Sequence, residues 1–328
     1  MRLLVDDRWL GATGIGRFAK EILQRVPSGV KVEKLSKTWG IKNPITPLLL
    51  GIEINRRAPD LFWTPGFMPP AISKSPYIVT VHDLIHLKYG SKMQVAYYNH
   101  VIRPLLGKAS CVLTVSEYAR GEILNWTGFS PDKVIAVNNA VSSGYTPEGG
   151  KFSPGYPYLL YVGNKRRHKN LERLLTAFSR AELPDDIKLV CTGDATKELS
   201  ELADKLKISH RLVFLGFVAE KDLPSVYRGA AAVMLVSLYE GFGIPLIEGM
   251  ACGVPVLASS VSAMPEVSGG AAHLVDPLSV EEISLGIERI VSDLELREEL
   301  IRKGNIRARV YSWDATADDV WKLFASVI

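Results

Sequence analysis

The residues best suited to chemistry are concentrated in residues 240–248, which read EGFGIPLIE. Two glutamates stand with seven residues between them, and the glycines between them allow the backbone to approach a ligand closely. Pro245 suits the first turn of a helix. The first amides of that helix would form an anion site suited to a diphosphate. Glu248 would lie about one turn into the helix, where a carboxylate can accept two hydroxyls, whereas Glu240 would precede it and face the reacting group.

A second candidate is the basic cluster Lys165–Lys169, which follows the apolar run Tyr158–Val162. A diphosphate leaving group develops negative charge as its bond breaks, and fixed cations at a strand end stabilise that charge without a metal. A solvated basic loop is the open alternative.

Two further candidates lie in the first half of the chain. Gly14-Ile15-Gly16 could bring its backbone close to a diphosphate, although a tight turn into a helix is the open alternative. Its spacing is not that of a dinucleotide fingerprint. His82 and His86 stand at the spacing of metal ligands, but no third ligand is apparent, so we expect no metal site. A structural role for His82 is also open.

These candidates need a scaffold, and the sequence predicts one from alternating strands and helices. In the first half, strands are expected at Arg2–Val5, Tyr77–Val81, Cys111–Val115 and Val134–Val137, and helices at Val95–Leu106 and Glu117–Trp126. In the second half, strands are expected at Tyr158–Val162, Lys188–Cys191, Val213–Leu215, Ala232–Val236 and Pro255–Ala258. Asn170 is expected to cap a helix that begins at Leu171. The pattern predicts an α/β fold with two doubly wound parallel sheets facing a cleft.

The domain boundaries follow from a stretch rich in Asn, Ser, Gly and Pro. We predict a first domain over 1–140, a linker over 141–155, a second domain over 156–310 and a terminal helix over 311–328.

Composition limits the class of protein. The formal net charge of +4 is mild and does not indicate a partner made of nucleic acid. No apolar run approaches the length of a membrane span, and acidic residues interrupt the first apolar run too early for a signal peptide. We therefore expect a cytoplasmic protein. We also expect its three cysteines, Cys111, Cys191 and Cys252, to be buried thiols.

The motifs taken together resemble the retaining glycosyltransferases of family 4, which have the GT-B fold. The signature of that family is a pair of glutamates spaced as Glu240 and Glu248 are, around a Gly-Phe-Gly core. The resemblance covers nearly the whole chain and includes, in order, Gly14–Arg17, Val81–Leu84, Val115–Glu117, Val162–Gly163, His168–Asn170, Leu215–Val218 and Tyr311–Trp313. It implies two Rossmann-like domains and a C-terminal helix that crosses back to the first domain.

The resemblance also implies roles for single residues. Glu248 would hold the ribose of a nucleotide-sugar donor, while Glu240 and His82 would contact the transferred sugar. Lys169 matches the second of two basic residues that hold the diphosphate, and for the first we choose Arg166 over Lys165. The predicted catalytic residues are Glu240, His82, Arg166 and Lys169. The predicted donor-binding residues are Gly14, Gly16, Arg166, Lys169, Val218, Glu240, Gly241, Phe242, Gly243, Ile244 and Glu248, with no metal and no cofactor.

The motif around His168–Glu172 is most similar to bacterial mannosyl- or rhamnosyltransferases of surface-polysaccharide synthesis. This implies retaining transfer of mannose or D-rhamnose from a GDP-linked donor to a glycan, carried on a lipid, in O-antigen or polysaccharide (lipopolysaccharide) biosynthesis. A UDP-sugar donor, a nucleotide-sugar epimerase of the same architecture and an NAD-dependent oxidoreductase are the alternatives. Weak association with the inner face of the cytoplasmic membrane, through residues such as Trp39, Lys42 and Arg56-Arg57, is open.

Overall fold

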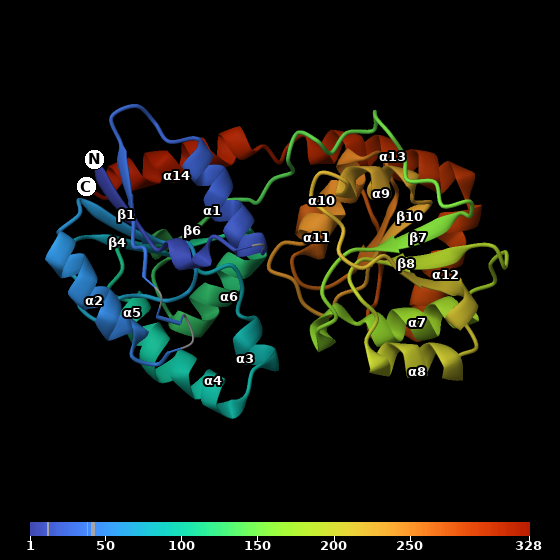
Figure 1. Ribbon diagram of the computed structural model, residues 1–328, viewed down its shortest axis with the longest axis horizontal. Coiled ribbons are helices and arrows are strands. Elements are labelled where there is room, and N and C mark those ends of the chain that lie inside the picture. Colours follow the sequence, from blue (N-terminus) through green and yellow to red (C-terminus); the bar gives the residue numbers. More distant parts are fainter. Residues whose placement is uncertain (12, 38, 41–42) are drawn as a thin grey trace. The chain divides into compact units, whose positions relative to one another are not determined.

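The structure is a computed structural model that describes residues 1–11, 13–37, 39–40 and 43–328. The chain divides into two compact units (Figure 1). Unit 1 comprises Met1–Asn139 together with Ser312–Ile328, and unit 2 comprises Ala140–Tyr311.

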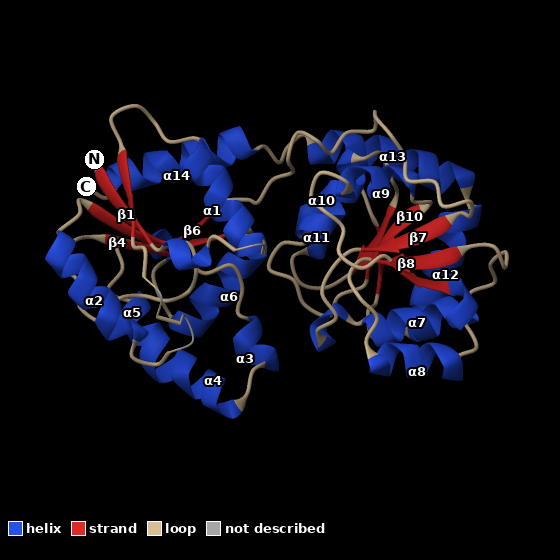
Figure 2. Cartoon of the chain, in the orientation of Figure 1, coloured by secondary structure: helices blue, strands red, loops and turns tan. Residues whose placement is uncertain are grey.

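Unit 1 is built on a six-stranded parallel sheet. Its strands are β1 (Arg2–Val5), β2 (Lys31–Lys34), β3 (Leu61–Thr64), β4 (Tyr77–Thr80), β5 (Cys111–Thr114) and β6 (Val134–Ala136). They lie in the order β2-β1-β3-β4-β5-β6, and every neighbouring pair is parallel. The inner strands β3, β4 and β5 are buried along their whole length because helices cover the sheet (Figure 2).

The helices of unit 1 vary in length. They are α1 (Gly14–Gln24), α2 (Thr46–Arg57), α3 (Ile85–Tyr89), α4 (Lys92–Tyr97), α5 (Arg103–Leu106), α6 (Glu117–Thr127) and α14 (Trp313–Ser326). A π-helical segment, Tyr98–Ile102, joins α4 to α5, so the helix expected over Val95–Leu106 is one continuous run with an irregular middle.

The terminal helix α14 packs in unit 1, as the resemblance implied. Trp321 donates from its indole Nε1 to the carbonyl of Ile22 in α1, at 3.2 Å. The ring of Phe324 lies 5.2 Å from that of Trp63 in β3. Buried aromatic contacts therefore attach the end of the chain to the first domain.

Unit 2 repeats the design with its own sheet. Its strands are β7 (Tyr158–Tyr161), β8 (Lys188–Cys191), β9 (Leu212–Phe214), β10 (Ala232–Leu235), β11 (Val256–Ser259) and β12 (His273–Val275). The order is β12-β11-β10-β7-β8-β9, again with parallel neighbours.

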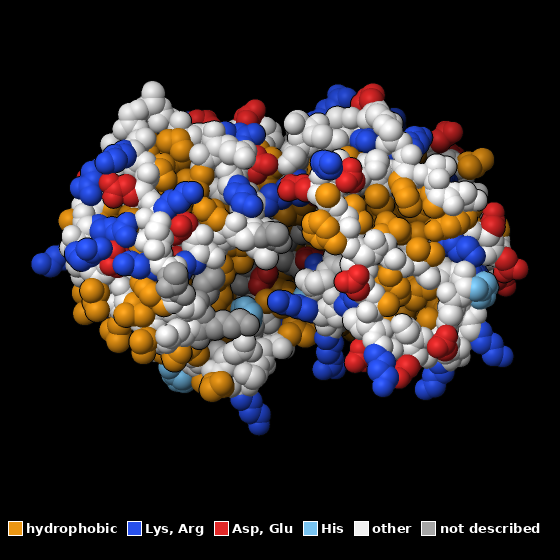
Figure 3. Space-filling view, in the orientation of Figure 1, with side chains coloured by type: hydrophobic (Ala, Val, Ile, Leu, Met, Phe, Trp, Pro, Cys, Tyr) orange, Lys and Arg blue, Asp and Glu red, His pale blue; other side chains and the backbone are white. Residues whose placement is uncertain are grey.

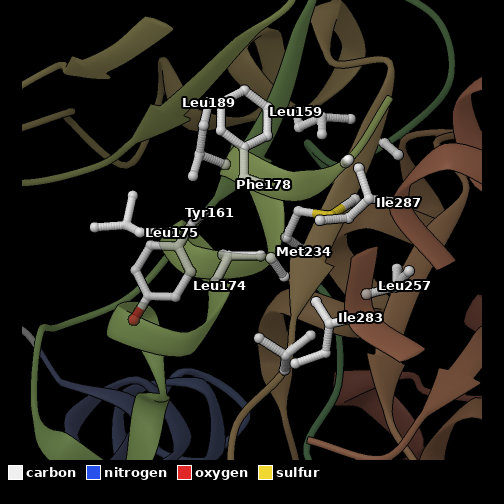
Figure 4. Packing of buried hydrophobic residues seen from close by; sticks show 14 of the residues in the cluster. Leu159, Tyr161, Leu174, Leu175, Phe178, Leu189, Met234, Leu257, Ile283 and Ile287 are labelled. Carbon is white, nitrogen blue, oxygen red and sulfur yellow. The ribbon is translucent and has the colours of Figure 1, made fainter. Parts of the chain in front are cut away.

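The helices of unit 2 are α7 (Leu171–Arg180), α8 (Lys197–Lys205), α9 (Leu223–Gly229), α10 (Ile244–Ala251), α11 (Met264–Ser268), α12 (Val280–Ser292) and α13 (Leu294–Ala308). One face of the sheet packs on α7 and α12. There, Phe178 and Leu174 of α7 and Ile287 of α12 surround Met234 of β10 (Figure 4). Two doubly wound domains, predicted from the alternation of elements, are thus confirmed.

The segment 141–155, expected as a linker, contains no helix or strand and packs against α9 of unit 2. The amide of Phe152 donates to the carbonyl of Ser225, and the guanidinium of Arg228 donates to the carbonyls of Gly150 and Thr146.

Candidate active site

The strand order of unit 2 marks one place where a ligand is expected. Strand β7 is followed along the chain by β8 on one side, whereas β10 lies on its other side. In open parallel sheets, ligands bind beyond the carboxyl ends of the strands where the order reverses in this way. The loops that leave β7 and β10 carry Lys169 and Glu240, respectively.

Those two residues form an ion pair. The Lys169 Nζ lies 2.6 Å from the Glu240 Oε1, and the two side chains are only 12% and 13% exposed. The hydroxyl of Ser237 donates to the same carboxylate oxygen at 2.7 Å. A cation and an anion, both mostly withdrawn from water, are therefore fixed at the switch point before any ligand arrives.

Hydrogen bonds between the two loops hold this pair in place. The amide of Leu238 donates to the carbonyl of His168 at 2.7 Å. The Nδ2 of Asn170 donates to the carbonyls of Val236 and Pro277 at 2.9 and 2.7 Å.

Asn170 is the N-cap residue of α7, as predicted, but its side chain does not cap the helix. Its backbone is left-handed, with φ of 61°, and its side chain makes no capping hydrogen bond. The amide group is used instead to join the ends of neighbouring loops, and its Oδ1 accepts from Arg173 at 2.7 Å.

Helix α10 follows the glycines of the motif. Gly243 precedes it with φ of +95°, and a Cβ there would lie 2.3 Å from the Cε of Met264. Glycine is therefore required for both backbone conformation and space. No side chain caps the first turn of α10. Because this turn directly follows the loop that carries Glu240, the positive end of the helix dipole suits an anionic ligand at that end of the sheet.

Glu248 lies in the second turn of α10 and is buried, with 2% exposure. The hydroxyl of Tyr227 in α9 donates to the Glu248 Oε2 at 2.7 Å. Burial next to this carboxylate raises the pKa of Tyr227 well above its ordinary value, so the phenol keeps its proton. The sequence showed nothing that pointed to Tyr227, because it lies in a short helix with an apolar appearance.

The other predicted donor-binding residues of unit 2 occupy varied surroundings. Gly241 and Phe242 are buried, and the Phe242 ring packs edge-on against Tyr311 at 5.3 Å. Ile244, at the start of α10, and Val218, after β9, are half-buried. Phe242 thus contributes mainly to packing, while Ile244 and Val218 retain surface that a ligand could contact.

The basic loop divides into buried and exposed members. The Lys165 Nζ donates to the carbonyl of Thr192 at 3.1 Å and lies 5.3 Å from the centre of the Phe214 ring. Arg166 is exposed and forms no ion pair with another described residue, although its carbonyl accepts from the amide of Lys169 at 2.8 Å. His168 is buried, and desolvation together with Lys169 lowers its pKa to about 4.

In unit 1, α1 begins at Gly14 with Thr13 as its cap. The Thr13 hydroxyl accepts from the amide of Gly16 at 3.2 Å. A Cβ on Gly16 would lie 2.0 Å from the carbonyl oxygen of Gly11. Gly16 therefore permits a close turn into the helix, while Gly14 is exposed.

His82 follows β4 and lies next to the loop that leaves β3. Its Nε2 lies 2.9 Å from the carbonyl oxygen of Pro65. A carbonyl can only accept, so Nε2 carries the proton and Nδ1 is the acceptor of the ring. Burial lowers the pKa of His82 to about 4, and the ring packs edge-on against Phe18 at 5.3 Å. A neutral histidine of this kind can accept a hydrogen bond from a ligand hydroxyl.

Other expectations concern metals, cysteines and membranes. Among the residues that the structure describes, no cluster of His, Cys, Asp and Glu could hold a metal ion. His86 packs instead against the rings of Phe67 and Tyr98. The three cysteines are buried and free, as predicted. Within the described part of the chain, no helix is both long enough and apolar enough to span a bilayer.

The comparison with solved structures places this fold among known architectures. The Anabaena protein Alr3699/HepE, solved with UDP-glucose, superposes with a TM-score of 0.82 at 18% identity, covering 99% of this chain and 100% of that one. A sucrose-phosphate synthase from Thermosynechococcus elongatus superposes with a TM-score of 0.81 at 18% identity, covering 99% and 98%. These similarities show that the fold is GT-B.

Sequence comparison is more specific. The O-antigen chain mannosyltransferase B of Escherichia coli is 30% identical over 265 residues, which cover 76% of this chain and 69% of the relative. The O-antigen chain mannosyltransferase RfbU of Salmonella typhimurium is 28% identical over 72% of this chain and 65% of its own. The family model "Glycosyltransferase Family 4" matches residues 12–144, and "Glycosyl transferases group 1" matches residues 147–307. The chain therefore belongs to the group 1 glycosyltransferases.

Proposed function

We propose that this glycosyltransferase moves mannose or D-rhamnose from a GDP-linked donor to a glycan acceptor during bacterial O-antigen or polysaccharide synthesis. The observation that carries the proposal is the ion pair of Lys169 and Glu240 at the switch point of unit 2. The names of the relatives support the sugar, since several are mannosyltransferases of O-antigen or serotype synthesis. A GDP-linked donor and a lipid-linked acceptor go beyond those names and form part of the proposal.

The donor would lie across the carboxyl ends of β7 and β10. Glu248 would accept the ribose hydroxyls, held in position by the hydroxyl of Tyr227. The diphosphate would lie between the amides of α10 and the ammonium of Lys169, where both stabilise negative charge. Arg166 is exposed and would need to turn toward the ligand to contribute. Val218 would lie near the base.

We propose that transfer retains the configuration of the sugar by a front-face route. The bond from the anomeric carbon to the diphosphate oxygen breaks, and the diphosphate keeps the electron pair. The acceptor hydroxyl forms its new bond on the same face, and its proton passes to the departing diphosphate. Glu240 is not the nucleophile in this scheme, because its Oε1 already accepts from Lys169 and Ser237 and positions the ammonium. His82, neutral at pH 7, would accept a hydrogen bond from a sugar hydroxyl.

The acceptor we propose is a glycan on a lipid carrier, which would bring the enzyme to the inner face of the cytoplasmic membrane. No metal ion takes part in this scheme, because Lys169 and the helix amides supply the positive charge. Transfer in the presence of EDTA would therefore proceed at the same rate as without it.

The proposal is tested by incubating the protein with GDP-[³H]mannose and lipid-linked glycans extracted from an O-antigen-producing bacterium. Label should enter the lipid fraction, and proton NMR of the product should show the anomeric configuration of the donor. The Glu240→Gln variant, which removes the ion pair while preserving shape, should transfer little label. Transfer from UDP-glucose but not from GDP-mannose would overturn the proposal of a GDP-linked donor. A product with inverted configuration, or a sugar trapped on Glu240, would overturn the front-face route.

A further inference from the structure

One face of α2 exposes large aliphatic side chains to solvent. Ile45, Leu48 and Ile52 are 51%, 57% and 65% exposed. Their spacing of three and four residues places them on a single side of the helix, beginning just before its first turn. The solvent side of a helix in a globular domain is ordinarily polar, so this side needs an explanation.

The loop that precedes β4 widens the same surface. The amide of Ala71 donates to the carbonyl of Pro47 at 2.8 Å, and a Cβ on Gly51 would lie 2.5 Å from the carbonyl oxygen of Ile72. Glycine at position 51 therefore lets the loop lie directly against the helix. This brings Ile72, which is 67% exposed, beside the helix side chains. We call Ile45, Leu48, Ile52 and Ile72 the aliphatic face.

Basic side chains stand around the aliphatic face. Arg56 lies one turn beyond Ile52 in α2 and is exposed. The amide of Lys74 donates to the Oδ1 of Asn55, and the Nζ of Lys108 lies 3.5 Å from the carbonyl of Ala71, so both lysines lie beside the loop that carries Ile72. Hydrophobic side chains gather over α2 in the space-filling view, with Lys and Arg nearby (Figure 3).

The acid of this helix, Glu53, lies beneath the surface and is paired with two arginines of the helix. Glu53 is buried and bound by the guanidinium groups of Arg56 and Arg57 at 2.6 and 2.7 Å. These bonds hold the pKa of Glu53 at about 2. Arg57 also donates to the carbonyls of Lys34 and Leu35 and is structural. Lys74 and Lys108 thus give the border of the face a positive charge toward a partner, while Glu53 offsets part of the charge of the exposed Arg56.

We propose that the aliphatic face docks on the surface of a bilayer that contains anionic phospholipids. Exposed aliphatic side chains beside basic ones are the composition that inserts shallowly at the boundary of headgroups and acyl chains. Cations near an anionic surface strengthen that attachment. The inference rests on the proposed function only in expecting a lipid-linked acceptor. The residues that form the aliphatic face and its border all lie in unit 1.

A membrane fits this face better than a protein partner. A stable protein interface engages roughly 20–30 residues from each partner. The aliphatic face offers four side chains, bordered by three cations. Four aliphatic side chains with a basic border suffice for reversible attachment to lipid, since each contact is with fluid acyl chains and needs no matched surface.

The residues considered from sequence as membrane contacts lie in different surroundings. Trp39 is half-buried, and the guanidinium of Arg8 lies 4.4 Å from its ring centre, so it packs within unit 1. Lys42 lies outside the described residues. Arg57 is structural, and Arg56 is the one that the aliphatic face includes at its border.

The test is flotation of the purified protein with two kinds of vesicle, pure phosphatidylcholine and phosphatidylcholine with roughly 30% phosphatidylglycerol. The wild type should float with the anionic vesicles, and added salt should weaken that binding. The Leu48→Glu/Ile52→Glu variant should lose roughly tenfold or more of its binding. The matched control is Leu285→Glu/Ile306→Glu in unit 2, at side chains that are 56% and 59% exposed, and it should bind as the wild type does.

Three results would overturn the proposal. The first is that the α2 variant binds anionic vesicles as well as the wild type does, and the second is that the unit 2 control loses as much binding as the α2 variant. The third is a wild type that sediments as a dimer and an α2 variant that sediments as a monomer, which would make the face a contact between two copies of the chain. If the glutamate variant misfolds, Arg56→Gln/Lys74→Gln/Lys108→Gln should still reduce binding to anionic vesicles. GDP binding, measured on each variant, separates this question from the donor proposal, since unchanged GDP affinity is expected throughout.

Discussion

At the level of single residues, the ion pair between Lys169 and Glu240 is the arrangement that most directly suggests catalysis. Both side chains are mostly buried, and their 2.6 Å contact joins the loops of two adjacent strands. A charge held this way needs little reorganisation when a leaving group becomes negative, which is why preorganised charges contribute strongly to rate.

Replacing Lys169 with alanine should therefore lower kcat by roughly 10²-fold. It removes the ammonium and leaves Glu240 without its cation. The measurement is turnover with saturating donor, and Lys197→Ala is the control because Lys197 is a surface lysine of the same unit, 84% exposed. Turnover near that of the wild type would remove Lys169 from the site.

The hydroxyl of Tyr227 donates to Glu248, and in the proposed site it would support this carboxylate rather than touch the donor, so its removal should act on binding. Tyr227→Phe takes one hydrogen bond from a buried carboxylate, a loss of about 1–3 kcal/mol. We expect donor affinity to fall about tenfold while kcat changes little. Tyr158→Phe is the control, since its hydroxyl donates to the carbonyl of Val226 instead. Equal affinity in both variants would mean that Tyr227 does not position Glu248.

His168 should make unit 2 less stable in acid. Its pKa is about 4 in the folded protein, below the ordinary value near 6.5, so the unfolded chain takes up a proton first as pH falls. The stability present above about pH 6.5 is lost between about 6.5 and 4, with about 2 kcal/mol gone at about pH 5. Urea unfolding at about pH 7.5 and about pH 5 measures how much the free energy of unfolding changes between the two pH values. That change should be smaller for His168→Gln than for the wild type. An unchanged difference would show that His168 titrates normally.

The residues of the site could be predicted from sequence only where a motif carries them. Glu240, Glu248 and Lys169 stand in such motifs, and the structure places Lys169 against Glu240. Tyr227 could not be found, because its position beside Glu248 depends on how α9 packs on α10. Nor could sequence decide between Lys165 and Arg166, since adjacent residues of a loop differ only in the direction of their side chains.

At the level of elements, the strands were predicted where continuous apolar runs marked them. β1 and β8 match the predicted bounds, and the other predicted strands differ by one residue at one end or at both. Strand β2, with the sequence KVEK, was not predicted because it lies at the sheet edge and is partly exposed. β3, with the sequence LFWT, is fully buried and was not predicted either.

The turn into α1 gives a prediction about a glycine. Gly16→Ala should destabilise unit 1 by about 2 kcal/mol or more, because the new Cβ would overlap the Gly11 carbonyl, 2.0 Å away. Gly121→Ala in α6 is the matched control, since nothing lies within 4 Å of its Cβ position. That change should stabilise by up to about 1 kcal/mol. Thermal unfolding measures both, and an unchanged midpoint for Gly16→Ala would show that the turn relaxes freely.

At the level of the whole molecule, two sheets of the same design are joined by a chain that returns to unit 1 through α14. Repeated alternation predicted both sheets, but the return of α14 came from the resemblance alone, because the long-range contacts of Trp321 and Phe324 leave no local pattern. The parallel strands of unit 2 end on one edge of their sheet, which is why residues as distant in sequence as Lys169 and Glu240 meet there.

We propose that unit 2 binds a GDP-linked donor through Glu248 and the start of α10. The most direct measurement is thermal unfolding of the wild type and Glu248→Ala with GDP, UDP, dTDP, ADP and NAD. A ligand that binds only the folded state raises the midpoint in proportion to its affinity and concentration. We predict a clear rise with GDP that Glu248→Ala abolishes. A rise of the midpoint with UDP alone would contradict a GDP-linked donor. A rise with NAD but with no nucleoside diphosphate would contradict the proposal that unit 2 binds a nucleotide-sugar donor.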